Sequence, residues 1–478
     1  RSRRSDAAGR DLRRSQQGFT NSPGQIDQAM ERAHFGGSDP GMLRLVSLGG
    51  ILVLLGLCWA FSKHRRAISW RLVVVAMLAQ AVLGGVFLTW ERGNEFLQSC
   101  GHAVEDFLKL SQRGSEFVFG VLGTGAPAVV EWPEGVEEQL PAGAVLPTVR
   151  LGFVFATQVL PTLIFFSAFL AVLYHLGLMQ LVVRGMAIVT TRLLGTSGAE
   201  SLSACANVFV GQTEAPLLVR PFLARMTPSE MHAVMTGGFA TIAGGVFALY
   251  VGFGIDAGHL MVASVMAVPA GLVCSKLLWP ETGEPLTRGR VQIPNERTAG
   301  NVVEAAANGA ADGLKLALNV GAMLIAFLGL VAVADWLLGF VSLLLQKVSI
   351  LSADDTLTLG RLLGWLFAPI AAVMGVPSAE IPILAELLGK KLVLTELVAY
   401  GDLAALKEAG KVSERTMLIA SFALCGFANL GSVAIQIGGL GAMAPERRGE
   451  IAKMAFRAMF AGAIATCITA CLAGVMSQ

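Results

Sequence analysis

The chain has 478 residues, of which 54% are hydrophobic and only 15% are charged, and its formal net charge is +2. Soluble proteins carry about 25% charged residues, so this composition excludes an ordinary water-soluble protein and favours one polytopic membrane bundle. The near-neutral charge gives no basic surface of the kind that binds nucleic acid.

The first 150 residues alternate between apolar and polar stretches. Residues 1–41 are polar and rich in arginine, which predicts a disordered or loosely attached tail. Apolar segments long enough to cross a membrane follow near 43–62 and 72–90, and the basic loop between them predicts a cytoplasmic location. Residues 93–122 mix charges with aromatic residues and indicate an interfacial amphipathic helix. Residues 126–148, rich in Pro, Gly and Glu, predict an exposed loop.

An acidic residue then lies inside an apolar segment. An apolar span near 151–177 and an amphipathic stretch at 178–195 lead into residues 199–224, where Glu214 lies between Gly211 and Pro216. A carboxylate at membrane depth is tolerated chiefly where it faces protein or water, and broken backbone is tolerated only where it lines a cavity or is buried. We therefore predict a re-entrant hairpin over about 199–224.

The second half of the chain repeats this order. It begins with two apolar spans, near 229–254 and 258–279, and a basic loop at 281–300. These are followed by a weakly amphipathic helix at 301–316 and a span near 317–340. An apolar stretch at 359–374 precedes a second interrupted segment, about 376–398, which contains Glu396. The last spans lie near 415–440 and 451–475. Each acid is followed by a glycine-rich helix with polar residues, at 236–245 and 425–432, where unwinding would free carbonyl oxygens to hold a cation.

These patterns predict an all-α polytopic membrane protein with eight transmembrane helices, two re-entrant hairpins, interfacial helices and an inverted repeat. The basic loops fall on one side if both termini face outward. The expected regions are the tail at 1–41, a scaffold at 42–177, a first repeat at 178–300, an interfacial helix and scaffold span at 301–358, and a second repeat at 359–478.

Two long motifs resemble the concentrative nucleoside transporter family of bacterial type. They are GQTEAPLLVRP at 211–221 with MTGGFATIAG at 235–244, and ELVAY at 396–400 with the run from Cys425 to Gly439. The ordered match covers roughly residues 42–475. The resemblance implies a homotrimer in which each protomer binds one nucleoside between the hairpins and the two broken helices.

The resemblance also implies the site residues. Those expected at the nucleobase are Gln212, Thr213, Glu214 and Val246. Those expected at the ribose are Glu396, Phe427, Asn429 and Ser432. Carboxylate and amide oxygens accept hydrogen bonds from hydroxyl groups, and Gln and Thr can both donate and accept at a base edge. The implied sodium ligands are all oxygen atoms, as a hard cation requires. They are the side chain of Asn207, the hydroxyl of Thr241 and the backbone carbonyls of Val210 and Ile242.

Each residue also has a structural interpretation. Glu214 and Glu396 can cap hairpins or pair with a nearby Lys or Arg, while Asn429 and Ser432 can hold helices together by hydrogen bonds. Phe427 taken alone would be a core residue. The recurrence of one acid in each broken segment favours a site, since intramembrane acids are functional by default.

We therefore predict a sodium-coupled nucleoside symporter in the inner (plasma) membrane, working by alternating access, with sodium as coupling ion and no organic cofactor. The alternatives are a proton-coupled symporter and a nucleoside-permeable channel or sensor on the same fold; Asn207 favours sodium. Gly211–Gln212 is compatible with pyrimidine or broad selectivity. A membrane enzyme is disfavoured because no HExxH, GxSxG or Cys/His cluster occurs in the sequence.

Overall fold

The computed structural model describes residues 39–124, 154–290, 299–347 and 356–477. The predicted tail, apart from residues 39–41, and the predicted loop at 126–148 lie outside these ranges. The described chain is built from helices, and its one isolated β-bridge joins Ser197 to Arg288.

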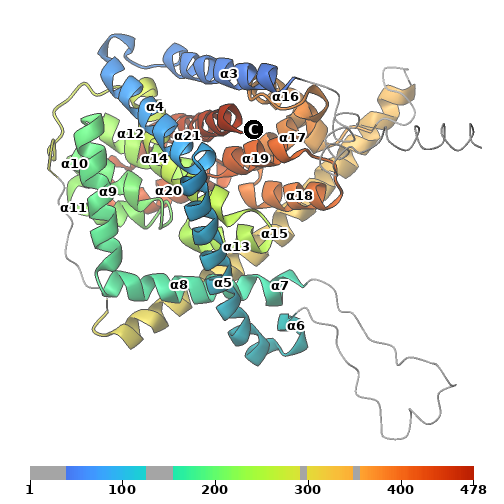
Figure 1. Ribbon diagram of the computed structural model, residues 1–478, viewed down its shortest axis with the longest axis horizontal. Helices are drawn as coiled ribbons and strands as arrows, with labels where there is room; N and C mark the ends of the chain where they lie inside the picture. The colour runs from blue at the N-terminus through green and yellow to red at the C-terminus, as the bar shows by residue number, and fades with distance from the viewer. Residues whose placement is uncertain (1–38, 125–153, 291–298, 348–355, 478) are drawn as a thin grey trace, which may run out of the picture.

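The N-terminal part supplies helices at two opposite edges of the bundle. Its helices are α3 (Pro40–Ala60), η1 (Arg65–Ala67), α4 (Trp70–Gly84), the π-helical turn η2 (Gly85–Thr89), α5 (Glu91–Phe119), α6 (Val121–Thr124), α7 (Phe155–Gln158) and α8 (Leu160–His175). The expected amphipathic helix at 93–122 is α5, which crosses α8 in Figure 1 and contacts it through Phe107 and Phe169, with ring centroids 4.4 Å apart.

The middle of the chain holds the first interrupted region. Its helices are α9 (Leu178–Leu194), α10 (Gly198–Ala206), η4 (Ala215–Val219), α11 (Arg220–Leu223), α12 (Pro228–Ala240), α13 (Gly244–Gly252) and α14 (Ala257–Leu278). The span expected at 229–254 is thus two helices, because the chain leaves helical geometry at Thr241, whose backbone is extended.

The C-terminal part holds the second interrupted region. Its helices are α15 (Val302–Lys347), α16 (Leu359–Val373), η5 (Ser378–Glu380), α17 (Ile381–Val393), α18 (Glu396–Glu408), α19 (Glu414–Leu424), α20 (Leu430–Met443), η6 (Pro445–Arg447) and α21 (Arg448–Met476). The span expected at 415–440 is again broken, between α19 and α20.

Two boundaries differ from the expectation. The helix expected at 301–316 and the span expected at 317–340 form the single helix α15, 46 residues long. Glu396 lies at the start of α18, which continues to Glu408, ten residues or so beyond the limit of 398 expected for the second hairpin. This helix carries charged residues, of which Asp402 forms an ion pair with Lys390 of α17 at 2.6 Å.

The helices separate into central and peripheral ones. Figure 1 shows α14 and α21 between α3 at one edge and α8 at the opposite edge. The apolar span of α14 is 89% buried inside the protein, whereas that of the last part of α15 (Leu328–Lys347) is 6% buried. The peripheral helices α8 and α15 pack closely on each other, because Gly309 and Gly313 allow α15 to approach the backbone of α8. An added Cβ would lie 2.7 Å and 2.9 Å from the carbonyl oxygens of Ser167 and Leu163.

Six helices among the described residues are long and apolar enough to cross a membrane: Pro40–Ala60, Trp70–Thr89, Phe155–His175, Ala257–Leu278, Leu328–Lys347 and Pro445–Met476. The broken pairs α12/α13 and α19/α20 fail this criterion because each member is too short. Counting each pair as one crossing gives the predicted eight, and that count stays a prediction.

Candidate functional site

The two broken helices meet at their breaks. The backbone N–H of Phe427 donates to the carbonyl of Thr241 across 3.2 Å. Gly426 lies directly against α12, and a Cβ added there would lie 2.8 Å from the carbonyl oxygen of Phe239. Glycine at 426 is therefore required for the two breaks to approach each other.

Each helix that restarts after a break has one of its first N–H groups bonded to a group outside the helix. Asn429 is the N-cap of α20, and its Oδ1 accepts from the backbone N–H of Ser432 at 2.8 Å. At the start of α13, the N–H of Gly244 donates to the carbonyl of Phe209 in the first hairpin at 3.1 Å. The hairpin is thus joined to the broken helix by backbone as well as side-chain contacts.

Glu396 lies at the centre of a buried polar cluster. Its side chain is 5% exposed, one carboxylate oxygen accepts from the hydroxyl of Tyr250 at 2.9 Å, and the other accepts from the amide Nδ2 of Asn429 at 2.9 Å. The sequence paired Glu396 with Asn429, and the structure brings them together. A carboxylate has about four lone-pair sites, so two remain for further donors.

Tyr250 is a residue that the sequence reasoning missed. Its ring packs on that of Tyr400, with centroids 4.3 Å apart. The chain has only 3 tyrosines, and two of them meet here. That scarcity is the signal that would have found them.

A second set of contacts joins the first hairpin to α20. Gln212 Nε2 donates to the hydroxyl of Ser432 at 3.0 Å, and Gln212 Oε1 accepts from Gln436 Nε2 at 3.1 Å. All three side chains are buried. The predicted residues Gln212 and Ser432 are therefore in contact, and Gln436, which the sequence reasoning did not single out, joins them.

The remaining predicted substrate residues form no side-chain hydrogen bond with this cluster among the residues that the structure describes. Glu214 lies at the exposed tip of the first hairpin, where one carboxylate oxygen accepts from the N–H of Gly211 at 2.5 Å. Thr213 is half-buried beside Gly439 of α20. Phe427 is half-buried where the breaks of the two broken helices meet. Val246 is buried in α13. The structure thus buries one of the two acids and leaves the other at the hairpin tip.

The predicted sodium ligands lie where two helices end together. Asn207 follows the last residue of α10, and Thr241 follows the last residue of α12. Asn207 packs against α12, since a Cβ added to Gly237 would lie 3.3 Å from its Nδ2. Helix C-termini carry free carbonyl groups and partial negative charge, which favours a cation between them.

Asn207 supplies the observation that tests this site. Its Nδ2 donates to the carbonyl of Ser203 at 2.9 Å, whereas its Oδ1 is buried and has no hydrogen-bond partner in the described part of the chain. The hydroxyl of Thr241 donates to the carbonyl of Gly237 at 2.9 Å, which leaves its oxygen lone pairs available. Val210 is half-buried and Ile242 is buried. These neutral oxygen donors fit a sodium ion.

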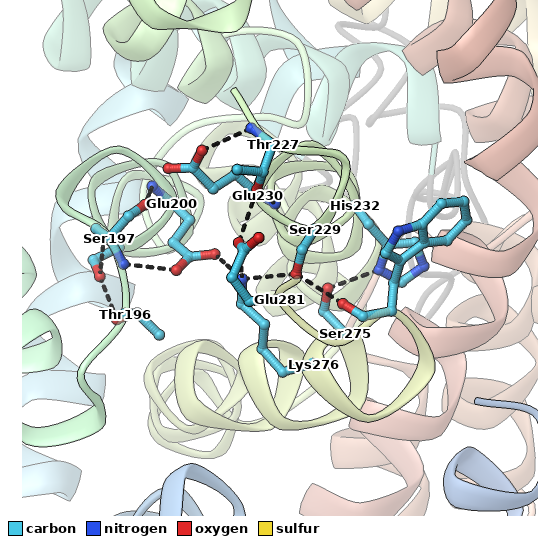
Figure 2. A network of polar contacts seen from close by, with 12 residues as sticks. Thr196, Ser197, Glu200, Thr227, Ser229, Glu230, His232, Ser275, Lys276 and Glu281 are labelled. Atoms are coloured by element: carbon cyan, nitrogen blue, oxygen red, sulfur yellow. Dashed lines mark hydrogen bonds and ion pairs between the residues drawn. The ribbon is translucent and has the colours of Figure 1, made fainter. Parts of the chain in front are cut away.

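Buried charges fix the base of the first hairpin. Figure 2 shows Lys276 of α14 between Glu200 and Glu281. Its ammonium lies 2.6 Å from Glu200, near the start of α10, and 3.5 Å from Glu281, and it donates to the hydroxyl of Ser229 at 2.9 Å. The other limb is held by Arg447, whose guanidinium donates to the carbonyls of Leu223 and Met226 at 2.7 and 2.8 Å.

The second hairpin has an anchor of a different kind. Lys391 of α17 is 2% exposed, and its ammonium donates to the carbonyl of Ala423 at 2.8 Å and to the hydroxyl of Thr466 at 2.9 Å. This buried cation joins α17 to the end of α19 and to α21.

Comparison with known proteins identifies the family. Family models match residues 49–122 (Na+ dependent nucleoside transporter N-terminus), 156–257 (Nucleoside recognition) and 259–474 (Na+ dependent nucleoside transporter C-terminus). An uncharacterized transporter of Haemophilus influenzae is 40% identical over 435 residues, which cover 90% of this chain and 97% of that protein. The chain belongs to the sodium-dependent nucleoside transporter family.

Further relatives agree. The human sodium/nucleoside cotransporter 1 is 41% identical over 447 residues, and the match covers 91% of this chain and 64% of that protein. The solved structure of CNTnw in an inward-facing substrate-bound state is 41% identical, has a TM-score of 0.79, and matches over 91% of this chain and 98% of that chain. A variant of CNTnw in an outward-facing state gives a TM-score of 0.81 over 91% of this chain and 99% of that chain.

The resemblance to concentrative nucleoside transporters of bacterial type is therefore confirmed. The family and the apolar helices make the chain an integral, multi-pass membrane protein, consistent with the predicted inner-membrane location, and nucleoside transport is its class of function.

The ion pairs of Figure 2 predict a large loss of stability on removal of one partner. Lys276→Met leaves Glu200 buried and uncompensated, which costs about 3–5 kcal/mol. We expect a lower thermal unfolding temperature for the purified protein in detergent, and partial recovery in the Glu200→Gln/Lys276→Met double variant. Lys407→Met is the matched control, because Lys407 donates to the carbonyl of Gly254 at an exposed position. Equal unfolding temperatures for Lys276→Met and Lys407→Met would contradict this account.

Proposed function

We propose that the chain is a sodium-coupled nucleoside symporter that works by alternating access. The observation that carries the proposal is the buried, unpartnered Oδ1 of Asn207 between the ends of α10 and α12. An unsatisfied buried amide oxygen is costly unless it has a ligand, and a sodium ion would take it.

The same stretch of backbone links the cation site to the substrate site. Only four residues lie between Asn207 and Gln212, and among them Phe209 accepts from Gly244 of α13. A sodium ion held by Asn207, Val210, Thr241 and Ile242 would fix the hairpin tip against the broken helix, which positions Gln212. Binding of the nucleoside would raise the affinity for sodium by the same factor, since the coupling is reciprocal.

The nucleoside would lie between the hairpin tip and the cluster around Glu396. In this proposal Glu396 and Asn429 would accept from the ribose hydroxyls, with Ser432 and Phe427 beside them. Gln212, Thr213, Glu214 and Val246 would face the nucleobase. Hydrogen bonds to a charged acceptor contribute about 1.5–3 kcal/mol each, so the carboxylate supplies most of the ribose recognition. The exposed apolar surface of α15 is compatible with the homotrimer that the family resemblance implies.

Transport into proteoliposomes tests the proposal. Uridine is expected to accumulate against its gradient when an inward sodium gradient is imposed, and not in choline buffer. Accumulation driven by a pH gradient without sodium would assign the protein to proton coupling instead. Flux that only follows the uridine gradient would indicate a channel.

The hydroxyl of Thr241 is expected to contribute to sodium affinity. Thr241→Val keeps the shape but removes the oxygen ligand, so the half-saturating sodium concentration should rise about tenfold, which corresponds to 1.4 kcal/mol. Thr241→Ser keeps the hydroxyl and is the control. Sodium activation curves of uridine uptake measure both, and identical curves for Val and Ser would remove Thr241 from the site.

The carboxylate of Glu396 is expected to recognise the ribose. Glu396→Gln should raise the KM for uridine at least tenfold and reduce the preference for uridine over its deoxy analogues, because a site that bonds hydroxyls rejects ligands that lack them. Tyr250→Phe removes a neighbouring donor but leaves the carboxylate, so it should have a smaller effect. Undiminished transport by Glu396→Gln would exclude this role.

A further inference from the structure

Gln436 is a buried glutamine of α20, one helical turn beyond Ser432 and 1% exposed. Its Nε2 donates to two acceptors, the side-chain oxygen of Gln212 at 3.1 Å and the backbone carbonyl of Met235 at 3.0 Å. Both hydrogens of the amide are therefore used, and the side chain connects the first hairpin with α12 and α20.

The carbonyl of Met235 fixes which way the Gln436 amide points. A backbone carbonyl can only accept, so a flipped Gln436 would place two acceptors against each other and lose both bonds. Amide orientations follow from the hydrogen-bond network, and here the network has a fixed end in the backbone of α12. The nitrogen of Gln436 must face Gln212.

The orientation of Gln212 follows from that of Gln436. Because Gln212 Oε1 accepts from Gln436, Gln212 Nε2 must lie on the opposite side, where it donates to Ser432 at 3.0 Å. One hydrogen of this nitrogen goes to Ser432 and the second is left to donate. Gln436 Nε2 thus donates both to the carbonyl of Met235 and to Gln212, and Gln212 in turn donates to Ser432.

Gly238 makes room for this chain. A Cβ at position 238 would lie 2.7 Å from Gln436 Nε2 and 2.8 Å from the Cβ of Gln212. Glycine inside a helix costs about 1 kcal/mol relative to alanine. Its presence in α12 is explained by the two amides that pack against it.

We propose that Gln436 is a positioning residue that makes Gln212 a hydrogen-bond donor toward the nucleobase. The inference rests on the proposed function, in which Gln212 faces the base. A donor at this position favours a base edge that presents a carbonyl oxygen over one that presents an amino group. Both pyrimidines carry a carbonyl oxygen at the 2-position, so the proposal places the free N–H of Gln212 at the 4-position. Uracil has an oxygen there and cytosine an amino group, and the arrangement then favours uridine over cytidine.

The test compares uridine and cytidine uptake in proteoliposomes, with kcat/KM measured for each. Gln436→Met has the same length but no polar group, so the Gln212 amide is free to turn and the uridine preference should fall at least fivefold. Gln436→Glu is a second variant, because a carboxyl group has at most one donor and cannot serve both Met235 and Gln212.

Gln80 provides the matched control. It is also a buried glutamine in a helix, and its Nε2 donates to the carbonyl of Met266 at 3.0 Å and to Thr469 at 3.2 Å, away from the site. Gln80→Met should leave the ratio of uridine to cytidine unchanged. A double-mutant cycle adds the decisive measurement: in a Gln212→Met background, Gln436→Met should no longer alter the ratio.

The outcomes separate the two proposals. A wild-type protein that transports neither nucleoside would overturn the proposed function. A wild-type protein that transports them, with the same ratio in Gln436→Met as in Gln80→Met, would overturn the positioning role. The role would also be overturned if Gln436→Met still changed the uridine-to-cytidine ratio in the Gln212→Met background. It would likewise be overturned if both Gln436 variants failed to reach the membrane while Gln80→Met did.

Discussion

The structure depends on satisfying the backbone groups that are freed where α12 and α19 end. A bilayer offers these groups no water, so their partners must come from the protein. Thr241 and Phe427 satisfy each other across the crossing, Gly244 donates to Phe209, and Asn429 caps α20. The close contact at Gly426 exists because this exchange requires the two backbones to touch. The residues with binding chemistry lie beside the breaks, where carbonyls and amides are not committed to a helix.

Buried polar groups make the two halves of the site interdependent. Glu396, Tyr250 and Asn429 form one cluster, and Gln212, Ser432 and Gln436 form another. Asn429 and Ser432 join them, because the cap of α20 is a bond between these two residues. A change in the first hairpin is therefore transmitted to the residues around Glu396 through a single helix start. Within the described residues the Oε1 of Gln436 is the buried oxygen of this network that has no hydrogen-bond partner.

The sequence predicted the positions of the helix breaks and several of the residues beside them. Acids between Gly and Pro inside apolar segments, and glycine runs after them, marked the breaks, and the family resemblance paired Glu396 with Asn429. Hydropathy alone did not predict that α18 continues to Glu408, because this helix carries charged residues such as Asp402, which pairs with Lys390. It also failed at α15, where a polar stretch and an apolar stretch form one helix. Gln436 and Tyr250 could not be found from spacing, because their partners are distant in the sequence and only packing brings them together.

The anchors at both limbs of the first hairpin have a consequence for the entropy of ligand binding. Lys276 holds the limb at Glu200, and Arg447 holds the other limb at Leu223. Immobilising a free residue costs about 1–2 kcal/mol in backbone entropy. With both ends already fixed, only the short tip between α10 and η4 is left to be ordered. Binding at this tip would therefore carry a smaller entropy cost than binding to a free loop, and a larger share of the interaction free energy would contribute to affinity.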